Sequence, residues 1–334
     1  MANLVIASVC NLSCPYCFAE DYYHALKTSS GSAFTSLEVF KEQLDFLERS
    51  GIHEVRLIGG EPSLHPHFSE IIRQAHRRAK NILIFTNGLI PDEALLTLES
   101  LSPEECTVLV NTNTTIELGS NEKVRQRRSD IIHRLGQRIL LGYNIYRLDF
   151  DLNPLLDLIQ AADCRKVIRL GLAHPTLSGQ NVFLHPKHYP FVGQKIAEFA
   201  DDAAKKGIVV EFDCGFVRCM FTNESMDLLI RAGVNPGWHC NAILDINLDK
   251  TVFHCFPLAK YAQVTMMANS NAADLRTQLS AQVQTYRSAG IYKECSSCSL
   301  KREGECTGGC LASTMRRFQR ADFSIRLPGK RKVK

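Results

Sequence analysis

Residues 4–18, "LVIASVCNLSCPYCF", join a short apolar run to a loop with three cysteines. Residues 4–9 have the composition of a β-strand, and Cys10, Cys14 and Cys17 follow on one short loop. If this strand belongs to a parallel sheet with helical crossovers, the loop lies at the carboxyl end of the strand, where such folds place their functional groups. The three thiols can belong to a disulfide, a zinc site, or an iron–sulfur cluster with one open position.

The chain after this loop alternates between strand-like and helix-like segments. A helix over 36–50 is predicted to begin with a capping box of Thr35 and Glu38. Strand–helix alternation predicts a parallel sheet with helical crossovers, and near-continuous apolar strands fit burial on both faces. We therefore expect a full or partial (β/α) barrel, or a doubly wound sheet. The further β-rich runs are 54–59, 81–86, 107–112, 139–146, 166–172 and 208–212.

Composition restricts the class of protein. The 334 residues are 45% hydrophobic, enough for one large domain or two ordinary ones. The N-terminus lacks the basic region and long apolar run of a signal peptide, and no apolar stretch is long enough to span a bilayer. We therefore expect a cytoplasmic protein without a membrane partner. Thirteen cysteines in a reducing compartment favour metal or redox chemistry over structural disulfides.

The pattern changes after residue 212, where helical periodicity fades and cysteines become frequent. We predict a barrel domain over 1–213, a smaller cysteine-rich α+β domain over 214–320, and a basic, loosely ordered tail over 321–334. The net charge of +4 indicates no particular partner, and no aromatic-rich basic motif supports nucleic-acid binding. Cys106 and Cys164 lie apart from the other cysteines and are predicted to be small apolar core residues.

The spacing C-x3-C-x2-C of the first loop resembles the radical S-adenosylmethionine (SAM) superfamily. Zinc usually takes four ligands in two separated pairs. Three thiolates can instead hold three irons of a 4Fe–4S cluster and leave the fourth iron open. The resemblance implies a partial (β/α)6 TIM-like barrel in which Cys10, Cys14 and Cys17 bind this cluster and the open iron binds SAM.

Further strand ends match the same family. Gly59, Gly60 and Glu61 follow the second strand and correspond to the motif that binds the amino group of SAM. Two glycines expose backbone carbonyls, and a carboxylate adds charge; a tight turn with a solvated glutamate is the alternative. The resemblance also implies SAM contacts for three residues that are otherwise ordinary core or turn residues, namely Tyr16 at the adenine and Asn113 and Asn144 at the ribose or carboxylate.

The cysteine-rich region resembles the SPASM domain, an extension with auxiliary clusters. "CNAILDINLDKTVFHC" (240–255) is similar to its β-hairpin, with Lys250 where a turn glycine is usual. "CSSCSLKREGECTGGC" (295–310) gives C-x2-C-x7-C-x3-C, and the usual later cysteine does not follow. The resemblance implies one or two auxiliary 4Fe–4S clusters. It also implies that Cys240, Cys255 and Cys310 share one cluster with Cys219 or Cys214, and that Cys295, Cys298 and Cys306 hold the other, whose fourth ligand stays open. We predict Cys219 for the first cluster and Cys214 for the second.

Cys214 has a second predicted role, because a free thiol at the barrel mouth can return a hydrogen atom to a substrate radical. The resemblance implies that a reductant, a ferredoxin or flavodoxin, drives cleavage of SAM to a 5′-deoxyadenosyl radical, which abstracts a substrate hydrogen. By family frequency we expect a peptide or protein side chain as substrate, to be cross-linked, epimerised or oxidised. A small molecule such as a sugar, nucleoside or cofactor precursor is the alternative.

Two further expectations concern partners. The first strand begins at residue 4, which leaves no room before it for a leader-peptide-binding domain. A peptide substrate is then expected to be recognised by the barrel mouth, the basic tail or a separate leader-binding protein. A non-catalytic cluster protein for electron transfer or nucleic-acid binding is a third hypothesis, and Gly59-Gly60-Glu61 speaks against it, because an electron carrier needs no SAM site.

Overall fold

The computed structural model describes residues 1–20, 22–23, 32–78, 81–113, 122–178 and 180–319. The basic tail expected over 321–334 lies outside these residues. Ten strands form one sheet with the order β10-β9-β8-β1-β2-β3-β4-β5-β6-β7. Pairing from β1 through β7 is parallel throughout. These seven strands occupy the seven β-rich runs predicted from the sequence: β1 (Asn3–Ala7), β2 (Glu54–Gly59), β3 (Asn81–Thr86), β4 (Cys106–Asn111), β5 (Ile139–Ile145), β6 (Val167–Leu172) and β7 (Val209–Phe212).

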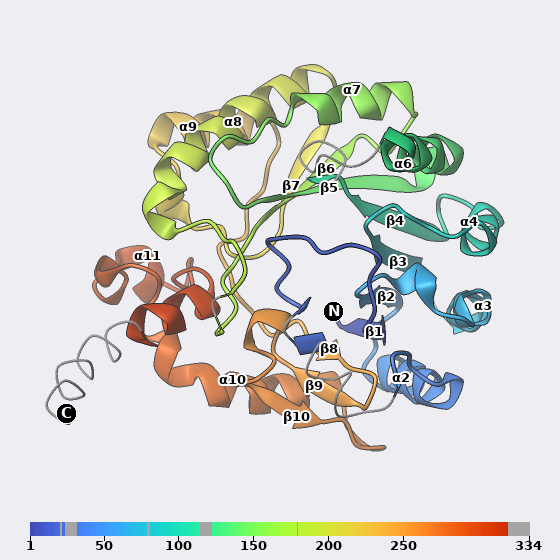
Figure 1. Ribbon diagram of the computed structural model, residues 1–334. Helices are drawn as coiled ribbons and strands as arrows, with labels where there is room; N and C mark the ends of the chain where they lie inside the picture. Colours follow the sequence, from blue (N-terminus) through green and yellow to red (C-terminus); the bar gives the residue numbers. More distant parts are fainter. Residues whose placement is uncertain (21, 24–31, 79–80, 114–121, 179, 320–334) are drawn as a thin grey trace, which may run out of the picture.

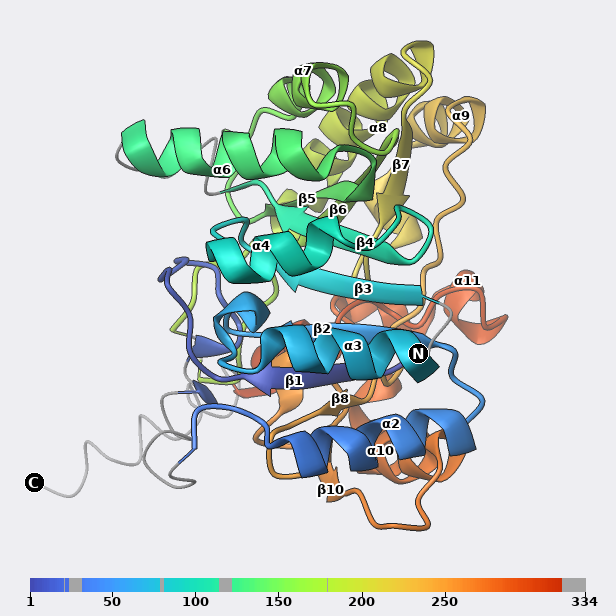
Figure 2. The same cartoon turned by 90° about the vertical axis from the view of Figure 1, so that its right-hand side faces the viewer.

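The crossover helices lie outside a curved sheet, which Figure 1 shows as an arc of strands surrounded by an arc of helices. Figure 2 shows the same helices covering the outer face of the strands. Because they cover the outer face, the architecture is the predicted partial barrel and not a doubly wound sheet. The helices of this part are α2 (Leu37–Arg49), α3 (Phe68–Arg78), α4 (Asp92–Glu99), α6 (Glu122–Leu135), α7 (Asn153–Ala161), α8 (Tyr189–Lys205) and α9 (Asn223–Arg231).

The core lies between the sheet and the helices, and the alternation of side chains along each strand decides what faces inward. In β6, Ile168 and Leu170 are fully buried in this core. Arg169 lies between them and faces the opposite way, with its side chain 21% exposed. It bridges to Asp213 over 2.8 Å, just beyond β7. The interior of the barrel therefore carries charged groups, which suits a site more than a packed centre.

The start of α2 differs from the predicted capping box. Ser36 is the N-cap, and its hydroxyl accepts a hydrogen bond from the Val39 amide at 3.2 Å. The Thr35 hydroxyl instead donates to the Val5 carbonyl of β1 at 2.9 Å. The capping box with Thr35 was therefore wrong by one residue, because a long-range bond to the sheet fixes the threonine.

The cysteine-rich region continues the sheet. β8 (Asp245–Ile246) pairs parallel with β1, β9 (Thr251–Phe253) pairs antiparallel with β8, and β10 (Gln263–Thr265) pairs antiparallel with β9. The predicted hairpin is confirmed. At its turn Lys250 has φ +68°, a left-handed conformation that favours glycine. Since β8 extends the barrel sheet, the division into domains at 213/214 stays a prediction.

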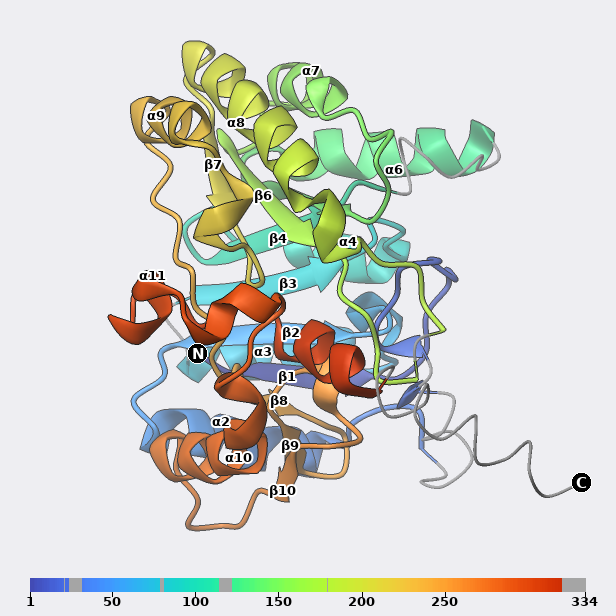
Figure 3. The same ribbon diagram turned by 90° about the vertical axis from the view of Figure 1, so that its left-hand side faces the viewer.

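The last helices flank the open side of the arc. Figure 3 shows α10 (Ala272–Arg287), in orange, beside α2 at the β10 end of the sheet, and α11 (Ser299–Arg302), in red, between this end and β7. This placement brings the late cysteines to the side of the barrel where β7 ends the sheet. Across the described part of the chain, no helix combines the length and apolarity required to cross a bilayer.

Candidate metal centre

The first cysteine loop leaves the sheet at the carboxyl end of β1. Cys10 is exposed, Cys14 and Cys17 are half-buried, and all three thiols are free. The Cys17 amide donates to the Cys14 carbonyl at 2.9 Å, which forms a turn between them. Burial raises the pKa of Cys14 to about 11, and the charges of Cys17 and Cys10 add to this effect. The three sulfur atoms therefore face a shared space at the barrel mouth.

Gly59 and Gly60 hold this loop against the end of β2. The Gly60 amide donates to the Ala7 carbonyl and the Glu61 amide to the Val9 carbonyl, each at 2.8 Å. A Cβ atom on Gly59 would lie 2.3 Å from the Ala7 oxygen, and one on Gly60 would lie 2.2 Å from the Val9 oxygen. Both positions thus require glycine because backbone approaches backbone, immediately before Cys10.

The Glu61 carboxylate points into the protein. It is fully buried and accepts hydrogen bonds from the Ser63 amide (3.2 Å) and hydroxyl (2.6 Å), from the Thr86 hydroxyl (2.9 Å) and from the Asn87 amide (2.9 Å). Its side chain therefore fixes the turn after β2 to the end of β3. A contact of this carboxylate with the SAM ammonium stays a prediction, and the structure adds a structural role that the sequence did not reveal.

Two residues missed by the sequence analysis link this turn to the cysteines. The Asn87 side chain donates to Asn11 at 2.7 Å and to the Cys10 sulfur at 3.6 Å. Arg128 of α6 is fully buried, and its Nε donates to the Asn87 carbonyl at 2.9 Å. Burial lowers the pKa of Arg128, while the charges of Cys14, Tyr16 and Glu61 oppose this shift. A buried guanidinium thus lies beside the loop, although Arg128 belongs to a basic run in the sequence.

Tyr16 is buried behind the cysteine loop. Its ring packs on Tyr146, with centroids 4.8 Å apart, and its hydroxyl accepts from the Asn111 side chain at 2.9 Å. Asn113 is fully buried and clamps the Asn144 backbone: its amide group donates to the Asn144 carbonyl (2.8 Å) and its oxygen accepts from the Asn144 amide (2.7 Å). Asn113 therefore joins β5 to the end of β4, and the SAM contacts predicted for Tyr16, Asn113 and Asn144 remain predictions.

The donor set at this mouth fits a cluster better than a single metal ion. Among the residues that the structure describes, no three His, Cys, Asp or Glu side chains converge closely enough to bind one ion. A cluster distributes its thiolates over several irons, so they need not converge on one point. Three free thiols on one loop, with glycines fixed beneath them, have the composition that a 4Fe–4S cluster with one open iron requires.

The eight later cysteines fall into two groups by the neighbouring thiols whose charges act on them. The first group consists of Cys214 and Cys255, which are half-buried, and Cys240 and Cys310, which are buried. Burial raises the pKa of Cys255, with the charges of Cys240, Cys310, Asp245 and Cys214 adding to it in that order. Cys240 and Cys310 are 7% and 5% exposed. Cys214 thus lies with the cysteines of the hairpin.

The second group consists of Cys219, Cys295, Cys298 and Cys306, and Cys306 is buried. Cys219 is exposed, and Cys295 and Cys298 are half-buried. Partial burial raises the pKa of the Cys219 thiol to about 11, and the charges of Cys295, Cys306 and Cys298 add to it. The cluster sets predicted from the sequence for Cys214 and Cys219 stay predictions.

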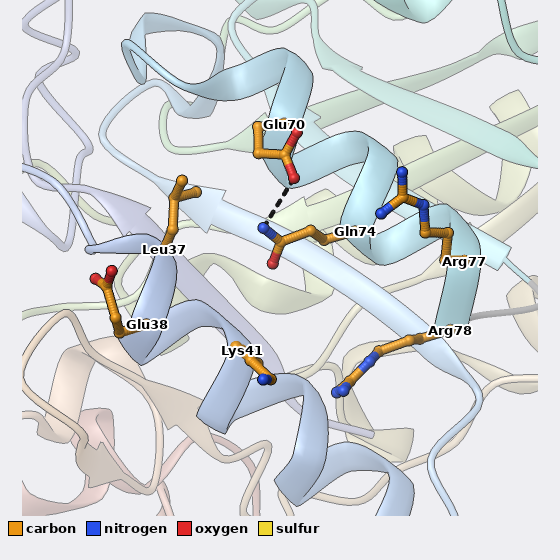
Figure 4. A pocket seen from close by; sticks show the side chains of 7 residues that line it. All are labelled: Leu37, Glu38, Lys41, Glu70, Gln74, Arg77 and Arg78. Carbon is orange, nitrogen blue, oxygen red and sulfur yellow. Dashed lines mark hydrogen bonds between the residues drawn. The ribbon is translucent and has the colours of Figure 1, made fainter.

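Two surface hollows differ in their relation to these groups. A small hollow of about 30 Å³ lies between the cysteine loop, the loop after β6 and the segment after Cys255; Phe18, Tyr22, Leu177, Phe256 and Lys260 are among the residues that line it. A larger one of about 360 Å³ lies on the outer side between α2 and α3 (Figure 4). Its charges are mixed: Lys41, Arg77 and Arg78 face Glu38 and Glu70. It lies on the helix side of the sheet, remote from the cysteine groups.

Comparison with known proteins adds to this geometry. Residues 4–134 match the family model described as the radical SAM superfamily. An S-adenosylmethionine-dependent nucleotide dehydratase of Selenomonas ruminantium is 30% identical over 137 residues, which cover 36% of this chain and 47% of that protein. The match therefore spans less than half of the relative's length.

Solved structures resemble nearly the whole chain in fold. Streptococcus suis SuiB bound to S-adenosylmethionine has a TM-score of 0.66 at 13% identity, covering 94% of this chain and 74% of SuiB. anSMEcpe bound to AdoMet and Cp18Cys peptide has a TM-score of 0.62 at 16% identity, covering 100% of this chain and 99% of that protein. At these identities the likeness concerns the fold alone.

Proposed function

We propose that this chain, whose residues 4–134 form a radical SAM domain, modifies a peptide or protein side chain by hydrogen abstraction. A reduced 4Fe–4S cluster together with bound SAM would supply the 5′-deoxyadenosyl radical that removes the hydrogen. The observation that carries the proposal is the cysteine loop held by Gly59 and Gly60 at the carboxyl end of β1. No simple binding module requires three thiols and this backbone cradle together.

Each part of the mouth would have a separate task. Cys10, Cys14 and Cys17 would hold the cluster, and the Gly59–Gly60 backbone would keep their loop in place. Tyr16, fixed by Tyr146 and Asn111, would flank the adenine. Inside the barrel, the half-exposed Arg169–Asp213 pair offers both charges to a substrate.

Support for a peptide comes from the fold of the whole chain, including the cysteine-rich region. SuiB has also been described with the precursor peptide SuiA, and anSMEcpe with a Cp18Cys peptide. In this proposal the protein works in the cytoplasm with a ferredoxin or flavodoxin, one or two auxiliary clusters, and, where a leader is present, a separate leader-binding protein.

A second candidate is the same chemistry on a small molecule. The similarity of the barrel to an S-adenosylmethionine-dependent nucleotide dehydratase favours it. The Arg169 guanidinium inside the barrel, which packs over the Phe85 ring at 5.3 Å, is a group that can bind phosphate or carboxylate.

The two candidates separate in one experiment. The protein is reconstituted without oxygen and given SAM, dithionite, and either short peptides encoded beside its gene or a panel of nucleotides and sugars. The proposal predicts that a peptide increases the yield of 5′-deoxyadenosine and that the mass of this peptide changes. With the Cys14→Ala variant, no 5′-deoxyadenosine forms and the peptide mass stays the same. If a nucleotide or sugar increases the yield of 5′-deoxyadenosine and is itself converted, while the peptides have no effect, the substrate is a small molecule and not a peptide.

A further inference from the structure

The inner face of the barrel carries a charged pair whose arginine extends across the sheet. Arg169 of β6 bonds to the Asp213 carboxylate beyond β7 through Nη2 at 2.8 Å. Its guanidinium also lies over the Phe85 ring of β3, at 5.3 Å from the ring centroid. Two strands, β4 and β5, lie between β3 and β6 in the sheet. The arginine side chain therefore spans the inner surface of the barrel, and 21% of it remains exposed.

Residues without charge line the path of this side chain towards β3. Gly142 of β5 pairs in register with Arg169 and has no side chain that could block the arginine. Leu109 of β4 lies beside this glycine, since a Cβ atom on Gly142 would be 2.8 Å from the Leu109 Cδ2. Towards β3 the guanidinium thus passes over apolar groups, which do not compete with an anion for its N–H donors.

Acidic groups lie on the opposite side of Arg169, towards β7. Asp213 is fixed as well as paired, because its Oδ1 also accepts a hydrogen bond from the Cys214 amide at 2.8 Å. Glu211 of β7 pairs in register with Arg169 and is exposed. A guanidinium has five N–H donors, and a single carboxylate oxygen uses only part of them. An anion inside the barrel is therefore repelled from the β7 side and directed to the remaining donors on the side of β3 to β5.

This position adjoins the site predicted for SAM. Gly171 follows Arg169 by two residues and faces the same side of β6. A Cβ atom on Gly171 would lie 2.4 Å from the Asn144 Oδ1 and 3.9 Å from the Asp213 Cβ. Asn144, a predicted SAM contact, and Asp213 thus flank the same glycine. A substrate group held by Arg169 would lie close to the cofactor, where the C–H bond has to be placed for abstraction.

We propose that Arg169 is the substrate anchor of the barrel and binds a carboxylate of the peptide, with Asp213 as its positioning residue. The carboxylate belongs to an aspartate or glutamate side chain or to the C-terminus of the peptide. This anchor rests on the proposed function, because it takes the peptide and the SAM site from it. A guanidinium can bind a carboxylate through two parallel hydrogen bonds, which fix its orientation as well as its charge. The substrate class is thereby an acidic peptide.

The test measures peptide binding without turnover. The full chain is reconstituted without oxygen, supplied with SAM but no reductant, and titrated with fluorescently labelled peptides encoded beside its gene. Each peptide is compared with versions in which one Asp or Glu is replaced by Asn or Gln, or in which the C-terminus is amidated. Loss of a charge-assisted hydrogen bond raises the Kd about tenfold to a hundredfold. We expect one of these changes to have this effect with the unaltered protein and none to have it with Arg169→Gln.

Three further variants separate an anchor from a merely structural ion pair. Asp213→Asn breaks the pair but keeps the guanidinium, so it should still bind the carboxylate form of the peptide more tightly than the amide form. Arg169→Lys keeps the charge without the fork of donors and should retain part of this preference. Arg134→Gln removes an exposed cation that pairs with Glu99 on the outer side and should bind like the unaltered protein. If Arg169→Gln and Asp213→Asn lose the preference equally, the pair is structural and the proposal is overturned.

The remaining outcomes separate this anchor from the proposed function. If a peptide is converted and its Kd is the same with Arg169→Gln as with the unaltered protein, the anchor is overturned and the proposed function stands. A weaker affinity for SAM in Arg169→Gln, with the peptide Kd unchanged, would also overturn the anchor, because the arginine would then bind the cofactor. If only a nucleotide or sugar is converted, the proposed function fails and the peptide carboxylate fails with it.

Discussion

The Asn87 amide donates to the Glu61 carboxylate over 2.9 Å, and this bond joins the end of β3 to the turn after β2 directly below the first cysteine loop. The same carboxylate accepts from Thr86 and Ser63. Four donors around one buried acidic group make this a structural junction. The loop with Cys10 lies above it, since Asn87 also donates toward the Cys10 sulfur.

Replacing Glu61 by glutamine should therefore lower the free energy of unfolding. The amide NH2 that replaces one carboxylate oxygen would face another donor, the Asn87 N–H, and an unsatisfied buried donor costs roughly 1–3 kcal/mol. Urea unfolding of the protein without iron measures this loss. Glu211→Gln, at an exposed position of β7, is the control and should change little. Equal stability of the two variants would show that the junction contributes nothing.

Gly60→Ala should displace the cysteine loop. The added Cβ would lie 2.2 Å from the Val9 carbonyl oxygen, which is backbone and cannot yield as a flexible side chain can. We expect the variant to fold but to lose most of the iron bound by Cys10, Cys14 and Cys17. Gly237→Ala, where no atom lies within 4 Å of the added Cβ, is the matched control. Normal iron content and normal SAM binding in Gly60→Ala would contradict the role of the glycine.

Lys250→Gly should stabilise the β8–β9 hairpin. A side chain in the left-handed region at φ +68° costs roughly 1–2 kcal/mol, which glycine relieves. The gain is reduced by loss of the exposed ion pair with Glu42 at 3.0 Å, worth about 0.2–1 kcal/mol. Lys250→Ala loses the pair but keeps the strain, so it should not be stabilised. The urea midpoints of unfolding of both variants test this prediction. If Lys250→Ala is as stable as Lys250→Gly, the backbone at residue 250 is not strained.

Local pattern in the sequence predicted the strands and the first loop. The apolar runs placed all seven parallel strands, because burial on both faces leaves a pattern within a few residues. The grouping of Cys10, Cys14 and Cys17 can also be read from the sequence, because the three residues lie close together in the chain. Lys250 was identified as a turn residue, and its positive φ explains why glycine is usual there.

Contacts between distant segments were not predictable in this way. The sequence predicts Thr35 as a helix cap, but its hydroxyl donates a hydrogen bond to the Val5 carbonyl of β1, thirty residues away. Arg128 belongs to a basic run of the sequence and is nevertheless fully buried, with its Nε bonded to the Asn87 carbonyl. Periodicity carries no information on such contacts between distant segments.

The central claim is that the loop of Cys10, Cys14 and Cys17 supports reductive cleavage of SAM. The most direct measurement is the yield of 5′-deoxyadenosine from SAM and dithionite with anaerobically reconstituted protein, beside Cys14→Ala and the core control Cys164→Ala. We predict 5′-deoxyadenosine with the unaltered protein and with Cys164→Ala, and none above background with Cys14→Ala. Equal yields from the unaltered protein and Cys14→Ala, or no yield from a protein whose first cluster is fully loaded, would contradict the claim.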